Sequence, residues 1–391
     1  MLRIALVSPN FPIPKAPYRG YYAYQTALAL QQWAEVEVFC PMAVYPPLLR
    51  PRSFRYRRAD LEYSPPGIRA RYFEYPAIPV VSRPWNGGIC AQRLLPYLEE
   101  ANPDVILDYW VYPEGYASVA AGRKLGKPVV VGALGSDLRL IPDPITRRRV
   151  AGTLRKAQFV ITVSEDLARI AVGMGAARPQ VRAVHNGCDT AVFYVADRLA
   201  ARARKDVAAD AELLVYTGRL EEPKGVMEAL TACGELAKRR PRLQMVYVGD
   251  GTLESLLRVR AAELGLTGRV RFAGVCTPGE VAEWLAACSL FCLPSYSEGC
   301  PNAVVEALAC GRAVVATNVG GIPELVRENS GILVPPRDSG RLAQAIEEAL
   351  RRPWDEAEIA RQGRRSWGQA AEETYRICAE TVRRFRNGET Q

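Results

Sequence analysis

The stretch LFCLPSYSEGCPNAVVEALACGRAVVAT at Leu290–Thr317 contains one complete repeat of the pattern that organises this chain. An apolar run at Leu290–Leu293 is followed by a turn of small residues, a helix predicted over Pro301–Cys310, and a second apolar run at Ala313–Thr317. The proline that opens the helix and the glycine that follows it suit those two positions. Short apolar runs on either side of a helix are typical of parallel strands that are covered on both faces.

The same alternation occurs in two series, one in each half of the chain, and predicts an α/β protein. The polar stretch Asp197–Asp210 between the two series is predicted to be a linker. We therefore predict two Rossmann-like domains whose parallel sheets face each other across a central cleft, with ligands bound beyond the carboxyl ends of the strands. The predicted strands are Arg3–Val7, Val36–Cys40, Val105–Leu107, Pro128–Val131, Phe159–Ser164 and Val181–Val184, and then Leu213–Thr217, Gln244–Val248, Val270–Ala273, Leu290–Leu293, Ala313–Thr317 and Gly331–Val334.

Chain length supports this division, because 391 residues are too many for one ordinary core. We predict an N-terminal domain at residues 1–195 and a C-terminal domain at residues 196–369. A final helix at about residues 370–391 is predicted to pack back on the first domain.

Composition favours a folded globular protein with an acidic partner. Apolar residues make up 49% of the chain and charged residues 24%, as in ordinary globular proteins. The net charge of +9 and the pI near 9.1 favour a sugar nucleotide, an anionic lipid or a nucleic acid. We expect no nucleic-acid partner, because the sequence contains no zinc-finger, helix-turn-helix or RNA-binding motif.

Cysteine usage and apolar runs indicate a cytoplasmic protein. The ten cysteines include no CxxC pair and there is one histidine, so reduced thiols are predicted rather than a zinc site. No run approaches the ~18–20 apolar residues that span a bilayer. The opening residues MLRIALVSPNFPIP have too short an apolar part for a signal peptide and are predicted to form a first buried strand.

One basic and aromatic segment, Val44–Tyr75, interrupts the alternation and is predicted to be a long irregular loop. It suits either a solvated surface or a contact with an anionic acceptor or lipid headgroups. Its arginines and aromatic residues are Arg50, Arg52, Arg55, Arg57, Arg58, Arg69 and Arg71, with Phe54, Tyr56, Tyr63, Tyr72 and Phe73.

Two glutamates bracket the predicted helix start in the stretch Pro294–Gly311. Backbone N–H groups from Gly299 to Ala303 would form an anion site there without help from a side chain. Glu298 precedes this site, and Glu306 lies in the second helical turn. Carboxylates accept hydrogen bonds from sugar hydroxyls and repel phosphate, so each is predicted to face a sugar ring with phosphates between them. Taken alone, Glu306 also fits an ordinary solvated helix residue.

A second candidate anion site is the strand-to-helix loop Thr217–Gly225. Gly218 and the glycine at the end of this loop allow the backbone to approach a ligand closely. Arg219 can hold a diphosphate through two parallel hydrogen bonds, and Lys224 adds a point charge. Two surface cations are the ordinary alternative for such a pair.

Taken together, these motifs resemble those of the retaining group 1 (family 4) glycosyltransferases of the GT-B type, which carry a Glu-x7-Glu motif. They occur in the order GRL…KG, VGDG, VRFAG, SEGCPNAVVEALACG, AVVATNVGG and GILVPP, after FVITVS and HNGCD in the first half. The resemblance covers nearly the whole chain. It implies a GT-B fold with an acceptor-binding N-terminal domain and a C-terminal domain that binds a nucleoside-diphosphate sugar.

The resemblance implies a role for individual residues of the donor site. Arg219 and Lys224 match the pair that binds the diphosphate. Glu298 matches the glutamate that holds donor-sugar hydroxyls, and Glu306 matches the one that holds the ribose. The loop at Gly274–Cys276 matches the base pocket. The predicted donor-binding set is Gly218, Arg219, Lys224, Gly274, Val275, Cys276, Glu298, Gly299, Cys300, Pro301, Asn302, Ala303 and Glu306.

The acceptor side departs from the family pattern at two positions. Gly20 stands alone where members often have two glycines, and Leu134 stands where a sugar-contacting histidine is expected. Asp137 follows and is kept as a catalytic candidate, whereas Trp110 and Tyr112 fit packing aromatics equally well. The predicted acceptor-side residues are Arg19, Gly20, Trp110, Tyr112, Glu114 and Asp137, and the catalytic candidates are Glu298, Arg219, Lys224 and Asp137.

The resemblance implies a hexosyltransferase of polysaccharide biosynthesis that retains the anomeric configuration and acts on a saccharide or lipid-linked acceptor. No Asp-x-Asp pair occurs in the chain, so we predict no metal, and no cofactor besides the nucleoside-diphosphate sugar as co-substrate. The expected location is the cytoplasm, with a peripheral contact at the inner face of an anionic membrane. The alternatives are a non-catalytic nucleotide-sugar-binding or scaffold protein of GT-B fold, a GT-B-fold sugar-nucleotide epimerase and, on the two glutamates alone, a glycoside hydrolase.

Overall fold

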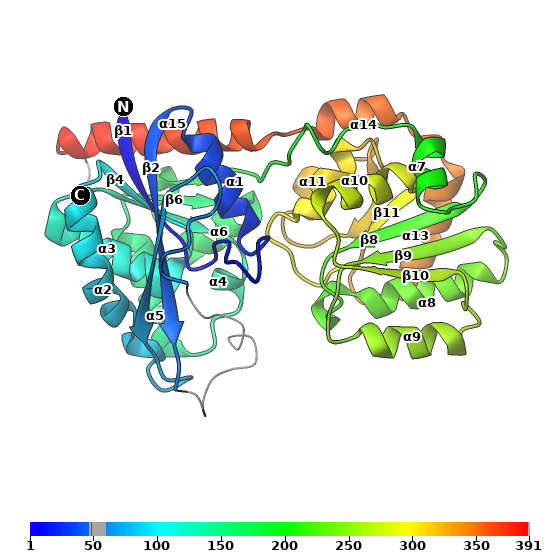
Figure 1. The fold of residues 1–391 in the computed structure, drawn as a ribbon, viewed down its shortest axis with the longest axis horizontal. Helices are drawn as coiled ribbons and strands as arrows, with labels where there is room; N and C mark the ends of the chain where they lie inside the picture. The colour runs from blue at the N-terminus through cyan, green and yellow to red at the C-terminus, as the bar shows by residue number, and fades with distance from the viewer. Residues whose placement is uncertain (47, 49–59, 390–391) are drawn as a thin grey trace. The chain divides into compact units, whose positions relative to one another are not determined.

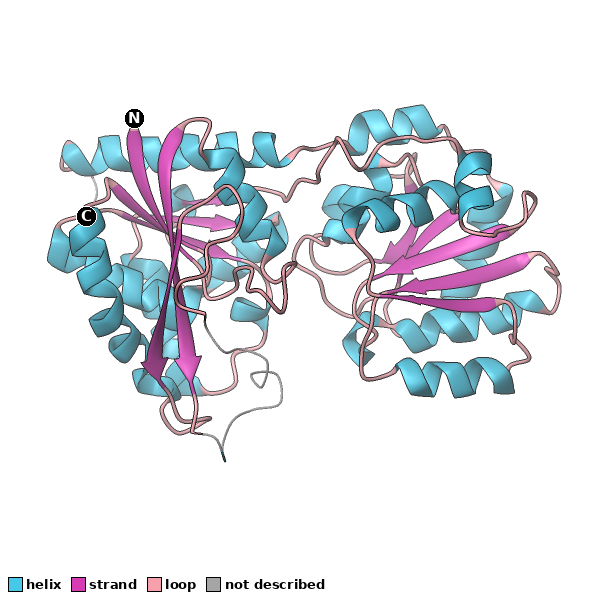
Figure 2. Ribbon diagram, viewed as in Figure 1, coloured by secondary structure: helices cyan, strands magenta, loops and turns pink. Residues whose placement is uncertain are grey.

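The computed structural model describes residues 1–46, 48 and 60–389, and these form two compact units (Figure 1). The first unit comprises Met1–His185 and Trp367–Gln391, and the second comprises Asn186–Ser366. Each unit contains a parallel sheet covered by helices (Figure 2). The predicted α/β class with two Rossmann-like domains is therefore confirmed. The boundaries predicted from the sequence, after residues 195 and 369, lie slightly later in the chain.

The first unit contains a seven-stranded sheet in the order β3-β2-β1-β4-β5-β6-β7, in which every neighbouring pair is parallel. Its strands are β1 (Leu2–Val7), β2 (Ala34–Val44), β3 (Ala70–Pro76), β4 (Val105–Asp108), β5 (Val129–Ala133), β6 (Phe159–Thr162) and β7 (Val181–Ala183). Its α-helices are α1 (Tyr21–Leu30), α2 (Asn86–Ala101), α3 (Tyr116–Leu125), α4 (Ser136–Arg139), α5 (Pro144–Lys156), α6 (Glu165–Gly173) and α15 (Trp367–Arg386).

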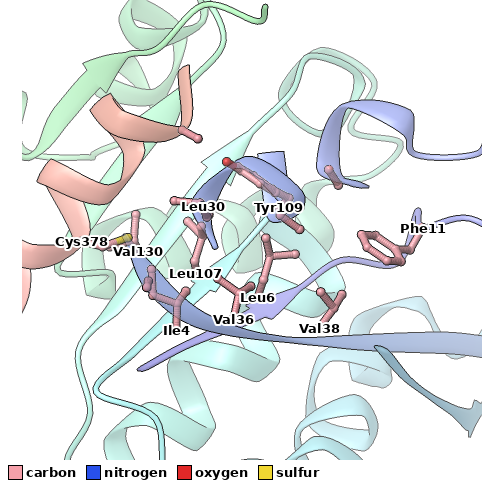
Figure 3. Close-up of a cluster of buried hydrophobic side chains, with 14 of the residues drawn as sticks. Ile4, Leu6, Phe11, Leu30, Val36, Val38, Leu107, Tyr109, Val130 and Cys378 are labelled. Atoms are coloured by element: carbon pink, nitrogen blue, oxygen red, sulfur yellow. The ribbon is translucent and has the colours of Figure 1, made fainter. Parts of the chain in front are cut away.

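A buried apolar cluster of the first unit lies between its sheet and helices α1 and α15 (Figure 3). Ile4 and Leu6 share one face of β1 because alternate residues of a strand point to opposite faces. They pack with Leu107 of β4, Leu30 of α1 and Cys378 of α15, and each of these side chains is at most 2% exposed. Helix α15 therefore belongs to the first unit although it follows the second unit in the sequence.

The second unit contains a six-stranded parallel sheet in the order β10-β9-β8-β11-β12-β13. Its strands are β8 (Glu212–Thr217), β9 (Leu243–Val248), β10 (Val270–Gly274), β11 (Leu290–Leu293), β12 (Val314–Thr317) and β13 (Gly331–Val334). Its α-helices are α7 (Arg198–Arg204), α8 (Val226–Ala237), α9 (Glu254–Glu263), α10 (Pro278–Ala287), α11 (Asn302–Ala309), α12 (Ile322–Leu325), α13 (Ser339–Arg351) and α14 (Glu356–Gly363).

The linker predicted at Asp197–Asp210 is wrong, because half of this stretch is helix α7 of the second unit. The Asp197 side chain caps the helix by accepting a hydrogen bond from the Ala200 N–H at 2.8 Å. Arg202 is buried, and its guanidinium donates to the Ala287 carbonyl at 3.0 Å and to Ser289 Oγ at 2.9 Å. Buried polar groups with partners make a fixed packing contact, so the polar composition was a misleading signal.

The irregular loop predicted at Val44–Tyr75 is wrong at its end, where β3 forms an edge strand beside β2. Tyr72 and Phe73 are buried, and Phe73 stacks on Tyr97 with ring centroids 4.8 Å apart. Arg71 pairs with Glu37 and Glu100, each at 2.7 Å. Arg71, Tyr72 and Phe73 are thus engaged in ion pairs and aromatic packing within the first unit. The predicted residues Arg50, Arg52, Phe54, Arg55, Tyr56, Arg57 and Arg58 lie outside the described residues.

Candidate functional site

The second unit contains a cavity of about 310 Å³ beyond the carboxyl ends of β8, β9 and β10. Parallel α/β sheets bind ligands at this edge. Residues of three strand-to-helix loops and of α11 surround the cavity. Six of the predicted donor-site residues line it, namely Gly218, Arg219, Val275, Cys276, Ala303 and Glu306. Five further lining residues were not in the predicted set, namely Thr217, Val248, Gly249, Asp250 and Val281. Gly249 and Asp250 belong to the VGDG turn, whose position after a strand was the available signal.

Two glycines hold the loops of this cavity together. Gly249 has a φ of 132°, and a Cβ atom there would lie 2.0 Å from the Gly218 carbonyl oxygen. Gly225 has a φ of 64°, and a Cβ atom there would lie 2.0 Å from the Pro294 carbonyl oxygen. Only glycine fits such contacts at a positive φ. The loop after β8 is therefore packed directly against the loops after β9 and β11.

Lys224 and Glu298, which are 74 residues apart in the sequence, form an ion pair at 2.6 Å. Their side chains are 25% and 10% exposed. The Tyr296 N–H donates to the Pro223 carbonyl at 2.8 Å beside this pair. The structure thus brings the cation from the loop after β8 and the carboxylate from the loop after β11 into direct contact.

Helix α11 begins at Asn302 and ends at Ala309, one residue inside each end of the predicted helix. Pro301 is the N-cap and keeps an extended ψ of 115°, so it does not take the first helical position. Asn186 holds the loop before the helix through two hydrogen bonds. Its Nδ2 donates to the Cys300 carbonyl at 3.1 Å and to Asn302 Oδ1 at 2.8 Å. Asn186 was not predicted as a site residue, although the HNGCD motif contains it.

Glu306 projects from α11 into the cavity and is half-buried. Burial raises the pKa of its carboxyl group from 4.5 to about 7. Its side chain makes no hydrogen bond or ion pair with another residue in the described part of the chain. This partial burial and raised pKa distinguish it from an ordinary solvated helix residue. A carboxylate in this position can accept hydrogen bonds from the hydroxyl groups of a ligand.

The first unit contains a larger cavity of about 490 Å³. The predicted acceptor-side residues Arg19, Trp110, Tyr112, Glu114 and Asp137 line it. Unpredicted lining residues include Asn10, Tyr45, Tyr75, Arg83, Asn86 and Thr146. These residues come from separate strands, helices and loops, so no single motif in the sequence marked them.

Backbone contacts fix the remaining acceptor-side positions. A Cβ atom on Gly20, which has a φ of 61°, would lie 1.9 Å from the Asn10 carbonyl oxygen, so this one glycine is required. The Arg19 guanidinium donates to the Pro9 carbonyl. Leu134 is half-buried against the apolar core, where the family pattern has a sugar-contacting histidine.

Three carboxylates are buried close to the larger cavity. Asp137 accepts hydrogen bonds from the Gly135 N–H at 2.7 Å and the Leu134 N–H at 3.0 Å, and burial raises its pKa. Glu114 is 3% exposed and accepts a hydrogen bond from the Tyr75 hydroxyl at 3.3 Å. Asp108 is fully buried, which raises its pKa well above the ordinary value. Burial of the charged form is the main cause in both cases where the pKa rises.

Tyr112 and Trp110 differ in their surroundings. Tyr112 is 7% exposed and donates its hydroxyl hydrogen to the Arg83 carbonyl, so it packs as well as lining the cavity. Trp110 is half-buried at the cavity wall. In the described residues, no group of three or more His, Cys, Asp or Glu side chains is arranged to hold a metal ion. No helix within those same ranges has the length and apolar character needed to cross a bilayer.

Comparison with protein-family models gives two matches that together cover most of the chain. The model described as "Glycosyl transferases group 1" matches residues 197–373, and the model described as "Glycosyltransferase Family 4" matches residues 20–192. The two matches divide the chain close to the division between the two units of the structure.

Curated proteins with similar sequences include a D-inositol 3-phosphate glycosyltransferase of Streptomyces bingchenggensis, which is 32% identical over 292 residues. That alignment covers 70% of this chain and 59% of the relative, so the chain spans less than two thirds of the relative's length. A putative teichuronic acid biosynthesis glycosyltransferase of Bacillus subtilis is 27% identical, with 88% of each chain covered.

Solved structures with the same fold include sucrose-phosphate synthase from Thermosynechococcus elongatus, with a TM-score of 0.72 at 22% identity. The alignment covers 99% of each chain. HepE of Anabaena in complex with UDP and glucose has a TM-score of 0.74 at 20% identity, covering 97% of this chain and all of that one. At these identities the likeness establishes the GT-B fold class alone.

Proposed function

The chain belongs to the group 1 glycosyltransferases, and from this premise we propose that it transfers a hexosyl group from a nucleoside-diphosphate sugar to a hydroxyl of a saccharide or lipid-linked acceptor. The observation that carries the proposal is the cavity of the second unit, where Arg219 and Glu306 line one space at the carboxyl edge of the sheet. A cation and an unpaired carboxylate suit a ligand that has both phosphates and hydroxyls.

In the proposed donor complex, Glu306 accepts hydrogen bonds from the ribose hydroxyls. Arg219 and Lys224 hold the diphosphate, and Glu298 exchanges part of its contact with Lys224 for the hydroxyls of the transferred sugar. The backbone N–H groups at the start of α11 add to the anion site. The Asn186 hydrogen bonds keep this loop in position before the donor arrives.

The proposed reaction breaks the bond between sugar C1 and the phosphate oxygen and forms a bond from C1 to the acceptor oxygen. The acceptor's proton passes to the departing phosphate oxygen, and attack on the same face of the sugar retains the anomeric configuration. Arg219 and Lys224 stabilise the charge that develops on the leaving diphosphate. We propose that these cations act without a metal ion or a further cofactor. Trapping a covalent glycosyl-enzyme would contradict same-face attack.

The acceptor is proposed to bind in the cavity of the first unit, where Glu114 and Asp137 provide carboxylate oxygens for sugar hydroxyls. In this proposal Asp137 also keeps the loop that begins at Leu134 in place. A cytoplasmic location with a peripheral contact at an anionic membrane completes the proposal.

The test is a thermal-shift titration with UDP, GDP, ADP and their sugar conjugates, followed by a transfer assay. One nucleotide series should stabilise the protein, because a ligand that binds only the folded state raises stability by about 2.7 kcal/mol at a hundredfold excess over Kd. Arg219→Ala and Glu306→Ala should lose the shift, whereas the exposed control Arg341→Ala on α13 should keep it. Binding without transfer to any acceptor would favour a non-catalytic protein, and no shift with any nucleotide would refute the donor site.

A further inference from the structure

Five large apolar side chains are exposed on two neighbouring segments of the first unit. Val80, Val81 and Trp85 follow β3 and are 71%, 64% and 61% exposed. Leu140 follows α4 and Ile145 lies in the first turn of α5, and they are 75% and 51% exposed. Scattered apolar residues are normal on a protein surface, but a contiguous group marks an interaction site. We call these five residues the rim surface.

The two segments of the rim surface lie side by side at the mouth of the larger cavity. The turn Arg83–Trp85 contacts α5, and Arg83 pairs with Asp143 at 3.5 Å. Arg83 and Leu140 both line the cavity. Figure 1 shows α5 at the end of the unit where β2 and β3 finish. The exposed apolar side chains therefore border the entrance to the proposed acceptor site.

The charge around the rim surface is strongly positive. The charged residues of segments 76–89 and 140–149 are Arg83, Arg147, Arg148, Arg149 and Asp143, four cations and one anion, which gives a net charge of +3. Arg147 and Arg148 are exposed. Asp143 is occupied by its pair with Arg83 and by capping α5, where it accepts the Thr146 N–H at 2.7 Å. Arg147 and Arg148 are thus available to phosphate groups outside the protein.

The backbone holds these apolar side chains outward. Pro79, Pro84, Pro142 and Pro144 restrict the two segments, so little conformational freedom remains to be lost on binding. Val80 has a φ of 65°, a conformation that a β-branched residue rarely adopts. Because Val80 is mostly exposed, burial within the protein does not compensate for this strain. Strained, exposed positions of this kind occur at binding surfaces.

We propose that the rim surface docks on a lipid bilayer that contains anionic phospholipids. Tryptophan and aliphatic side chains on protruding turns enter the interfacial region, while flanking arginines bind lipid phosphates. This identifies the surface for the peripheral contact in the proposed function. Docking of the rim surface also brings the mouth of the acceptor cavity to the bilayer. If the proposed transferase function holds, on which this part rests, the acceptor sugar is carried by a lipid in the same membrane.

The apolar part is tested by flotation of the full chain with vesicles of phosphatidylcholine alone or mixed with phosphatidylglycerol. The chain should float with the mixed vesicles. The variant Val81→Ser/Trp85→Ser should bind these vesicles at least about tenfold more weakly, because it loses apolar burial. The matched control Leu256→Ser/Val259→Ser changes side chains that are 52% and 58% exposed on α9 and should bind as the unchanged chain does.

The charged part is tested with Arg147→Glu/Arg148→Glu. Loss of the two arginines alone should weaken binding about 25-fold, at roughly fivefold for each, and added salt should weaken the unchanged chain as well. The control Arg123→Glu/Lys124→Glu makes the same charge change at the end of α3, which lies at the amino edge of the sheet, away from the cavity. This control should keep its binding.

The proposal is overturned if the unchanged chain does not float with anionic vesicles. It is also overturned if the variants of the rim surface float as well as the unchanged chain, or if both controls lose as much vesicle binding as those variants. In that case the exposed apolar residues would be a protein-docking surface instead. Nucleotide thermal shifts on the same proteins separate this result from failure of the transferase proposal, because the donor cavity is in the second unit. A normal nucleotide thermal shift without vesicle binding would refute the rim surface alone. Vesicle binding without a nucleotide thermal shift would refute the donor site alone.

Discussion

Replacement of Glu306 by glutamine should change how the stability of the protein depends on pH. Burial raises the carboxyl pKa from 4.5 to about 7 in the folded protein. Between these two values the folded state therefore binds more protons than the unfolded state. Stability must then fall as the pH rises from 4.5 toward 7, and the loss persists above 7. Glutamine is neutral at every pH and lacks this loss.

The size of the effect follows from the pKa change. At about 1.4 kcal/mol for each pKa unit, the rise from 4.5 to about 7 corresponds to at most roughly 3.5 kcal/mol. Solvent reaches the half-buried side chain and screens its charge, so we expect about 1–2 kcal/mol. Glu306→Gln should accordingly match the unchanged chain near pH 4.5 and be more stable by this amount at a pH about one unit above 7.

Calorimetric or urea-induced unfolding at the two pH values measures this difference. Glu235→Gln makes the same chemical change at an exposed position of α8 and should show no comparable pH-dependent gain. If Glu306→Gln follows the unchanged chain at both pH values, the carboxylate is solvated and the reasoning from burial is refuted. Nucleotide binding gives a second readout, because the charged carboxylate accepts hydroxyl hydrogens better, so affinity should rise through pH 7 in the unchanged chain alone.

Three further changes test the site. Lys224→Ala should lower the transfer rate on the order of 10²–10³-fold by removing a charged donor, and an unchanged kcat would exclude Lys224 from the reaction. Gly225→Ala should destabilise the protein by about 2 kcal/mol or more, because Gly225 has a positive φ and its Cβ would contact a backbone carbonyl. Thermal unfolding measures this loss. The control is Gly279→Ala, whose Cβ would meet no atom within 4 Å. Asn186→Ala should raise the donor KM with little loss of fold stability, since it frees the loop before α11; steady-state kinetics with an unaltered KM would count against this positioning role.

The sequence alone determined the two-sheet architecture, because buried parallel strands need continuous apolar runs that can be read locally. Strands Leu290–Leu293 and Gly331–Val334 were predicted with the bounds that the structure has. The strand Ala70–Pro76 was missed because it is an edge strand with one partner, and the charged residues Arg71 and Glu74 interrupt its apolar run. Helix α7 was missed because its polar composition hid the burial of Arg202.

The loops that carry the donor-site chemistry were also found from the sequence, since glycines and charged residues after strands are local signals. What those residues do to one another was decided by the tertiary structure. The Lys224–Glu298 pair spans 74 positions, and the raised pKa of Glu306 comes from burial by packed neighbours. The rim surface likewise exists only because the turn after β3 meets α5. Pairing and burial depend on distances between residues far apart in the chain, and local periodicity contains no information about such distances.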